Sequence, residues 1–108
     1  MRSVVDFEQL TADLFIFMKR ETTVEIFAEE SNFVVLRVPG RKYPGVLIQG
    51  DSLSGIVGDL EQAINLFETD KEESLGCLKL AYDGLKWRLN GYIQACEDNS
   101  EDLPFSKS

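Results

Sequence analysis

Residues 38–53 read VPGRKYPGVLIQGDSL, and this segment contains the change from strand to helix around which the rest of the chain is arranged. Its two Pro-Gly steps predict a stiff loop over 39–45, because proline fixes its own φ and glycine tolerates tight turns. The apolar run 46–49 then reads as a short strand. Gly50-Asp51-Ser52 ends that strand and begins a helix, in which Asp51 or Ser52 can accept hydrogen bonds from the first free N–H groups.

Upstream of this loop, two short stretches read as strands. Residues 22–28 alternate between apolar and polar residues, and residues 33–38 form a bulky apolar run with Val34, Leu36 and Val38 on one face. The polar residues 29–32 between them suit a hairpin turn. Together with the strand at 46–49, they predict a three-stranded antiparallel meander with one face available for helices.

Downstream, apolar residues recur at helical spacing in two long stretches. The first helix is predicted from about residue 51 to 67, and the second from about 72 to 97. The second helix carries the stripe Leu75, Leu78, Tyr82, Leu85, Leu89, Tyr92, Ile93 and Cys96. We expect both tyrosines of this stripe to be core residues. Gly76, Gly84 and Gly91 inside the helix predict close approach of another helix or a kink.

The N-terminal residues add one more helix to the prediction, from about Asp6 to Lys19. The predicted fold class is therefore α+β, with a three-stranded antiparallel meander packed against two long C-terminal helices and an additional N-terminal helix. The 108 residues suffice for a single domain, 1–108. Residues 98–108 read as a flexible acidic tail that docks through Leu103, Pro104 and Phe105.

The segment 39–53, PGRKYPGVLIQGDSL, resembles the same segment of an uncharacterised family of small bacterial proteins. Members of that family share PGR[KR], an aromatic residue and PG, followed by V, an aliphatic residue and IQGDSL. Leu103-Pro104 is similar to the closing L-P of the family. The resemblance implies these fold boundaries and a bacterial origin. The family has no established activity, so the resemblance implies no particular chemistry.

The composition excludes several classes of function. The chain contains no His, which removes the commonest general base and the commonest zinc ligand, and no Ser or Cys has a base beside it in the sequence. We therefore expect no enzyme, no metal site and no cofactor. The net charge of −8 opposes binding to nucleic acid or to an anionic membrane. The apolar run near the N-terminus is short, and Asp6, Glu8 and Asp13 interrupt the segment that contains it, so we expect no signal peptide and a cytoplasmic location.

Acidic residues cluster where the two predicted C-terminal helices meet, and only one cation, Lys71, lies among them. One interpretation is a solvated helix surface. The other is a docking surface on a small acidic protein-binding domain, an immunity-type inhibitor of a basic bacterial toxin, which the opposite charge would steer to it. The partner-binding residues would be Asp59, Glu61, Glu68, Asp70, Glu72, Glu73 and Trp87. Trp87 reads either as an exposed anchor or as a side chain in a groove between helices.

The loop at 39–45 supports an alternative function. Its two cations form a positive spot in an acidic chain, beside the predicted start of a helix. In this alternative the chain is a ligand-binding or regulatory module, and a solvated loop is the competing interpretation. The residues that would recognise the anionic group are Arg41, Lys42, Tyr43, Asp51 and Ser52. A three-stranded sheet also has two unpaired edges, which suggests a homodimer through a sheet edge as a further hypothesis.

Overall fold

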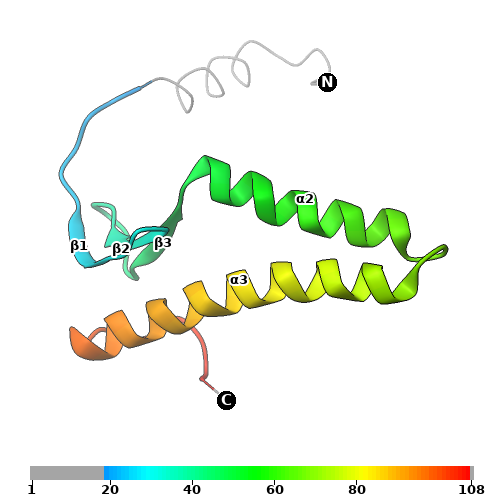
Figure 1. The fold of residues 1–108 in the computed structure, drawn as a ribbon. Coiled ribbons are helices and arrows are strands. Elements are labelled where there is room, and N and C mark those ends of the chain that lie inside the picture. Colours follow the sequence, from blue (N-terminus) through cyan, green and yellow to red (C-terminus); the bar gives the residue numbers. More distant parts are fainter. Residues whose placement is uncertain (1–18, 108) are drawn as a thin grey trace, which may run out of the picture.

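The structure is a computed structural model that describes residues 19–107, in which three strands are followed by two helices (Figure 1). The strands are β1 (Glu25–Glu29), β2 (Phe33–Arg37) and β3 (Gly45–Ile48). The helices are α2 (Gly50–Leu66) and α3 (Lys71–Asp98). The predicted α+β architecture of a meander and two C-terminal helices is confirmed, and both helices end within one residue of the predicted positions. The helix predicted for 6–19 lies almost entirely outside the described residues.

The sheet is an antiparallel meander in the order β1-β2-β3. The register between β1 and β2 shifts between Ile26 and Ala28, which marks a β-bulge in β1. Along β2, alternation places Phe33 and Val35 in the core, whereas Val34 lies on the opposite face and is half-buried. The face of the sheet that packs on the helices is therefore the one that begins with Phe33.

The sheet covers the C-terminal part of α3, and the core lies between them. The core residues are Phe33, Val35, Tyr92, Ala95 and Cys96. The aromatic ring of Phe33 lies over Gly91, where a larger residue would collide with it. Gly91 is a place of close approach, but the approaching group belongs to a strand, so the prediction that another helix approaches there is wrong. At Gly76 the space beside the helix is open.

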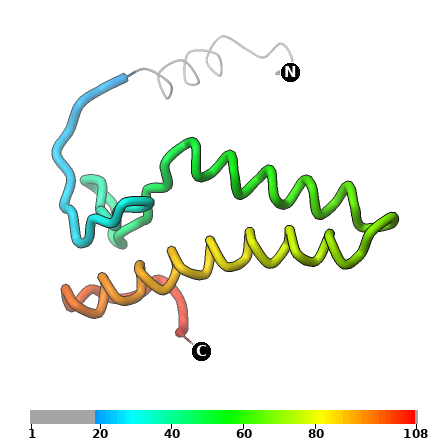
Figure 2. The backbone as a smooth tube through the Cα atoms, in the orientation of Figure 1, coloured from blue at the N-terminus to red at the C-terminus, as the bar shows by residue number. Residues whose placement is uncertain are grey.

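Helices α2 and α3 form an antiparallel hairpin that extends away from the sheet (Figures 1 and 2). Small side chains line the contact between the helices, because Ala63, Ser74 and Ala81 are all buried there. The hydroxyl of Ser74 donates a hydrogen bond of 2.6 Å to the carbonyl oxygen of Ala63. Asp70 caps α3 by accepting a hydrogen bond of 3.1 Å from the amide of Glu73. These contacts fix the closed end of the hairpin, where α2 turns into α3.

One side of this hairpin is apolar and exposed, and we call it the apolar face. In both helices, each residue of this face directly follows a residue that is turned toward the other helix. Because the helices are antiparallel, the two rows of apolar residues therefore lie side by side on the same side of the hairpin. Leu60, Ile64 and Phe67 from the α2 side and Leu78 from α3 line one groove on it. The apolar face consists of Leu53, Val57, Leu60, Ile64, Phe67, Leu75, Leu78, Tyr82, Leu85 and Leu89. The most exposed of these side chains is Ile64, at 74%.

Tyr82 belongs to the apolar face and is 58% exposed, so the prediction that it is a core residue is wrong. Tyr92, which lies on the same stripe, is buried as predicted, and its hydroxyl donates a hydrogen bond of 2.7 Å to the carbonyl oxygen of Pro44. The two tyrosines differ because the sheet reaches only the C-terminal part of α3. Helical spacing identifies the apolar side of a helix but not the length over which it is covered.

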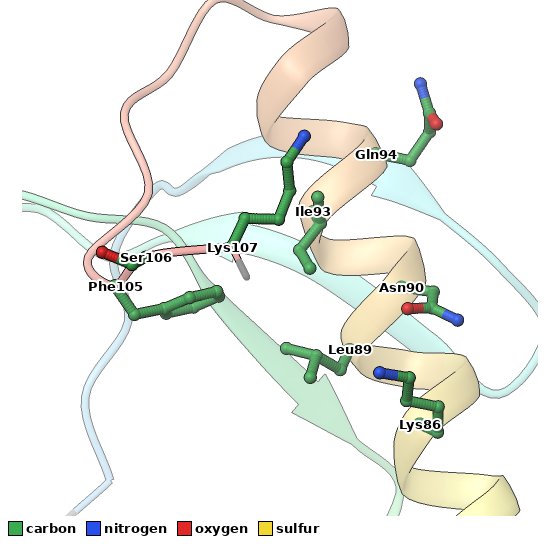
Figure 3. A pocket seen from close by; sticks show the side chains of 8 residues that line it. All are labelled: Lys86, Leu89, Asn90, Ile93, Gln94, Phe105, Ser106 and Lys107. Atoms are coloured by element: carbon green, nitrogen blue, oxygen red, sulfur yellow. The ribbon is translucent and has the colours of Figure 1, made fainter.

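Residues 99–107 fold back along α3. Leu103 packs against the core, and the ring centroids of Phe105 and Tyr92 lie 6.2 Å apart. Figure 3 shows Phe105 and Leu89 on either side of the hollow that they line between the tail and α3. The predicted docking of Leu103 and Phe105 is confirmed. The tail therefore borders the apolar face at the sheet end of α3.

Candidate functional site

Six acids predicted to bind a partner lie in the second half of α2, in the turn after it and at the start of α3, around the closed end of the hairpin. They comprise Asp59 and Glu61 in α2, Glu68 in the turn, Asp70 as the N-cap of α3, and Glu72 and Glu73 in its first turn. Asp59 is half-buried, and the other five are exposed. Across residues 19–107, the ion pairs lie elsewhere and none includes these six carboxylates. The closed end therefore carries concentrated negative charge that the described chain does not neutralise.

These acids surround the closed end and do not form one flat patch. Asp59 and Glu73 approach Cys77 from two different helices, and their charges add to the effect of burial, which raises the pKa of the Cys77 thiol. Glu61 lies one helical turn from both Val57 and Ile64, at the outer edge of the apolar face. The acidic surface thus extends from the edge of the apolar face around the turn to the opposite side of the hairpin.

Trp87 lies apart from the acidic residues. It follows Glu73 by 14 positions on α3, which corresponds to about 21 Å along the helix at ~1.5 Å per residue. Its ring packs edge-on against Phe33, with 5.0 Å between ring centroids and an angle of 85° between ring planes. The side chain is nevertheless 46% exposed. Trp87 therefore packs against the core residue Phe33 at the sheet end of α3 and remains partly exposed.

The cations of the alternative site stand at the tip of the loop between β2 and β3. The loop turns where the amide of Arg41 donates a hydrogen bond of 3.1 Å to the carbonyl oxygen of Val38, with Gly40 at a φ of +88°. The Lys42 ammonium lies 5.3 Å from the centroid of the Tyr43 ring. Arg41 and Tyr43 help to line a hollow beside the sheet. Neither loop cation pairs with an acid of the part of the chain that the structure describes.

The start of α2 is a separate place in the structure. The helix begins at Gly50 and has Gln49 as its N-cap, without a side-chain capping bond, so neither Asp51 nor Ser52 is the cap. The prediction for Asp51 is right in part, because its carboxylate accepts a hydrogen bond of 2.8 Å from the amide of Ser52. Ser52 plays no such role. Among residues 19–107, no hydrogen bond or ion pair joins this helix start to the loop cations.

An ion-pair network centred on Arg37 of β2 was not foreseen from the sequence. The Arg37 Nε donates to Glu25 at 2.7 Å, and Nη1 donates to Glu101 at 2.8 Å. The guanidinium also lies 5.3 Å from the centroid of the Phe27 ring. Hydrogen bonding to Glu25 and Glu101 raises the pKa of Arg37, and the bond from Arg37 lowers the pKa of Glu25. This network ties β1, β2 and the C-terminal tail together.

Further chemical features of the described residues are few. Residues 19–107 contain no group of three or more Cys, Asp or Glu side chains placed to hold a metal ion. Cys77 and Cys96 are free thiols, and burial raises the pKa of Cys96. No helix within this range combines the length and the hydropathy that a membrane span requires.

The fold and its surfaces define a small α+β domain, in which an antiparallel meander covers one end of a helical hairpin whose other end is acidic. Residues 18–105 match a family described as Family of unknown function (DUF6959), and the chain belongs to that family. The matched region includes all five described elements, the acidic closed end, the loop cations and the apolar face. The comparison with curated proteins and the comparison with solved structures give no significant match.

Proposed function

We propose that this chain is a small acidic protein-binding domain that receives a basic protein at the closed end of the α2–α3 hairpin. The observation that carries the proposal is the set of six carboxylates at that end, none of which forms an ion pair with another described residue. Charges that are not paired within a protein add to its long-range field, and such a field accelerates the encounter with a partner of opposite charge.

The partner that we favour is a basic bacterial toxin, for which the chain acts as an immunity-type inhibitor in the cytoplasm of a bacterium. A toxin that acts on nucleic acid has a basic active surface, because it must bind phosphates. Carboxylates on the helical hairpin would bind to that surface in place of the phosphates of the nucleic acid. Asp70 and Glu73 support this role in particular, because the capping bond between them holds the closed end in one conformation.

The test begins with co-expression of the chain with toxins encoded beside its gene, and it continues with binding kinetics for a toxin that is neutralised. The variant E72Q/E73Q removes two charges from the closed end, and the control E29Q/E30Q removes two charges where β1 ends and the turn to β2 begins. We expect association to slow by roughly 10-fold in the first variant at low salt, with little change in the control. Equal effects in both variants, or no neutralised toxin, would end the proposal.

A second candidate function uses the loop between β2 and β3. Arg41 and Tyr43 line a hollow beside the sheet, and this observation favours a site for a small anionic metabolite or for a carboxylate of a protein. The variant R41A/K42A should abolish a thermal shift induced by such a ligand and leave toxin neutralisation intact. An unchanged thermal shift in this variant would remove the second candidate.

A further inference from the structure

The apolar face is larger than the exposed apolar patches of ordinary monomers. Nine of its side chains are between 41% and 74% exposed, the extremes being Leu89 and Ile64. At roughly 200 Å² for a fully exposed large side chain, they present about 900 Å² of surface. The largest patch on a typical monomer covers ~300–600 Å². A stable protein–protein interface takes about 800 Å² from each partner, so the apolar face has the area of a dimer interface.

The two edges of the apolar face carry opposite charges. Glu61 lies one helical turn from the exposed Ile64 and marks the outer edge of α2, a helix that contains no Lys or Arg. Lys79 and Lys86 each lie one turn from Tyr82 and mark the outer edge of α3 in the same way. Glu72 lies one turn from Leu75 and places an acid on the same edge at the closed end of the hairpin. Over the middle of the hairpin, the face is therefore an apolar strip with acidic Glu61 at the edge of one helix and two lysines at the edge of the other.

This distribution is self-complementary in one arrangement only. If two hairpins met with α2 of one copy against α2 of the other, acid would oppose acid and lysine would oppose lysine. If α2 of each copy lies against α3 of the other, Glu61 of each copy comes close to Lys79 of the other at both edges. We propose that two copies of this chain pair through the apolar face in the second arrangement, as a four-helix bundle with two-fold symmetry.

Other occupants of the apolar face are disfavoured by the position of the family match. The match begins at residue 18 and includes the whole apolar face, so residues 1–17 are outside the shared unit that carries it. A foreign helix of one charge sign would match one border and oppose the other. A second copy supplies both signs in the required places. It would also bury Ile64 and Tyr82, which the described part of the chain leaves exposed.

The first test measures the mass of the full chain by sedimentation equilibrium. We expect a dimer, and we expect Ile64→Asp to raise its dissociation constant on the order of 100-fold or more, because a carboxylate would be buried in the interface. The control is Asn65→Asp, which adds the same charge at an exposed position outside the apolar face and should leave the dimer intact. Ile64 is exposed in a single copy, so its replacement leaves the monomer's own core untouched.

The second test fixes the arrangement of the two copies. Glu61→Lys and Lys79→Glu should each weaken the homodimer, because each places like charges at the two shared edges. An equimolar mixture of the two variants should recover dimers, since every edge of the mixed pair has opposite charges. If α2 faced α2, like charges would oppose each other at residue 61 both before and after the change. An unweakened homodimer of Glu61→Lys would therefore overturn the arrangement proposed here.

The remaining outcomes also decide the matter. A monomeric full chain at ~100 µM, well above the dissociation constants of stable interfaces, would overturn the proposal. If Ile64→Asp then lowered the melting temperature of that monomer, another segment of the same chain would be the occupant. If it did not, the face would belong to a different protein. The dimer does not depend on the proposed toxin binding, and E72Q/E73Q should leave the sedimentation result unchanged.

Discussion

The ring of Phe33 in β2 occupies the space that a side chain at Gly91 of α3 would need, and a Cβ on Gly91 would lie 2.9 Å from Cε1 of that ring. Trp87, one turn earlier on α3, packs edge-on against the same ring. The sheet can approach the helix this closely only because the helix has no side chain at this position. The seat of the sheet on α3 therefore depends on one glycine.

Replacement of Gly91 by Ala should destabilise the protein by about 1–3 kcal/mol, because the added methyl group overfills the core against Phe33. The matched control is Gly76→Ala in the same helix, where the space is open and the better helix propensity of Ala should stabilise by up to ~1 kcal/mol. Urea unfolding of both variants measures the difference. Equal stabilities of the two variants would contradict the role assigned to Gly91.

The contact at Gly91 illustrates how far the sequence carries the fold. Periodicity and the Pro-Gly loop are local properties, and they were enough to predict three strands, two helices and their order. They also marked Gly91 as an interior glycine, but the predicted neighbour was another helix, whereas the actual neighbour is an aromatic ring of β2. The exposure of Tyr82 shows the same limit, because the extent of the sheet over α3 is a tertiary property.

The candidate surfaces follow the same division. The acids at 59–73 are close in sequence, so their gathering at the closed end could be predicted from local structure. The position of Trp87 could not be predicted in this way. Its distance from the acids depends on the length of α3, and its contact with Phe33 depends on the path of β2. The pairing of Arg37 with Glu101 spans 64 residues, and no pattern in either segment indicates it.

Arg37 should hold the C-terminal tail on the sheet through Glu101. Replacement of Arg37 by Met keeps an unbranched stem over Phe27 and removes the ion pairs. The amide of Glu101 donates a hydrogen bond of 2.8 Å to the carbonyl oxygen of Cys96, and it should exchange with solvent faster in this variant. Arg41→Met, in the exposed loop, serves as the control with unchanged exchange. Unchanged protection of the Glu101 amide in Arg37→Met would show that the tail is held by its apolar contacts alone.

The acid side of the stability profile should depend on Glu25. The hydrogen bond from Arg37 lowers the pKa of Glu25 below its ordinary value of 4.5, so the folded chain keeps this carboxylate charged where the unfolded chain has begun to bind a proton. The stabilisation is present above pH 4.5 and is lost as the pH falls through the lowered pKa of the folded state. Urea unfolding between pH 3 and 6, in steps of about half a pH unit, should show that stability falls less steeply toward acid pH in Arg37→Met than in the wild type. A carboxyl titration of Glu25 by NMR that is the same in both proteins would contradict this assignment.

The hydroxyl of Tyr92 links α3 to the loop before β3. Its removal should change the free energy of unfolding at both neutral and alkaline pH. Tyr92→Phe leaves the buried carbonyl of Pro44 without its 2.7 Å hydrogen bond and should cost about 1–3 kcal/mol. The control Tyr82→Phe removes a hydroxyl outside the core of the single chain and should stay within about 0.5 kcal/mol of the wild type.

The alkaline effect follows from burial, which raises the pKa of Tyr92 from 10.0 to about 12. Between these values the unfolded chain has lost the phenolic proton while the folded chain retains it, so the wild type loses stability as the pH rises through this interval. Tyr92→Phe has no proton to lose, and its stability should fall less steeply there. Because the other titrating groups are common to both proteins, the difference between the two unfolding curves isolates Tyr92. A difference that stays constant across the interval would mean that the phenol is already free to ionise in the folded chain.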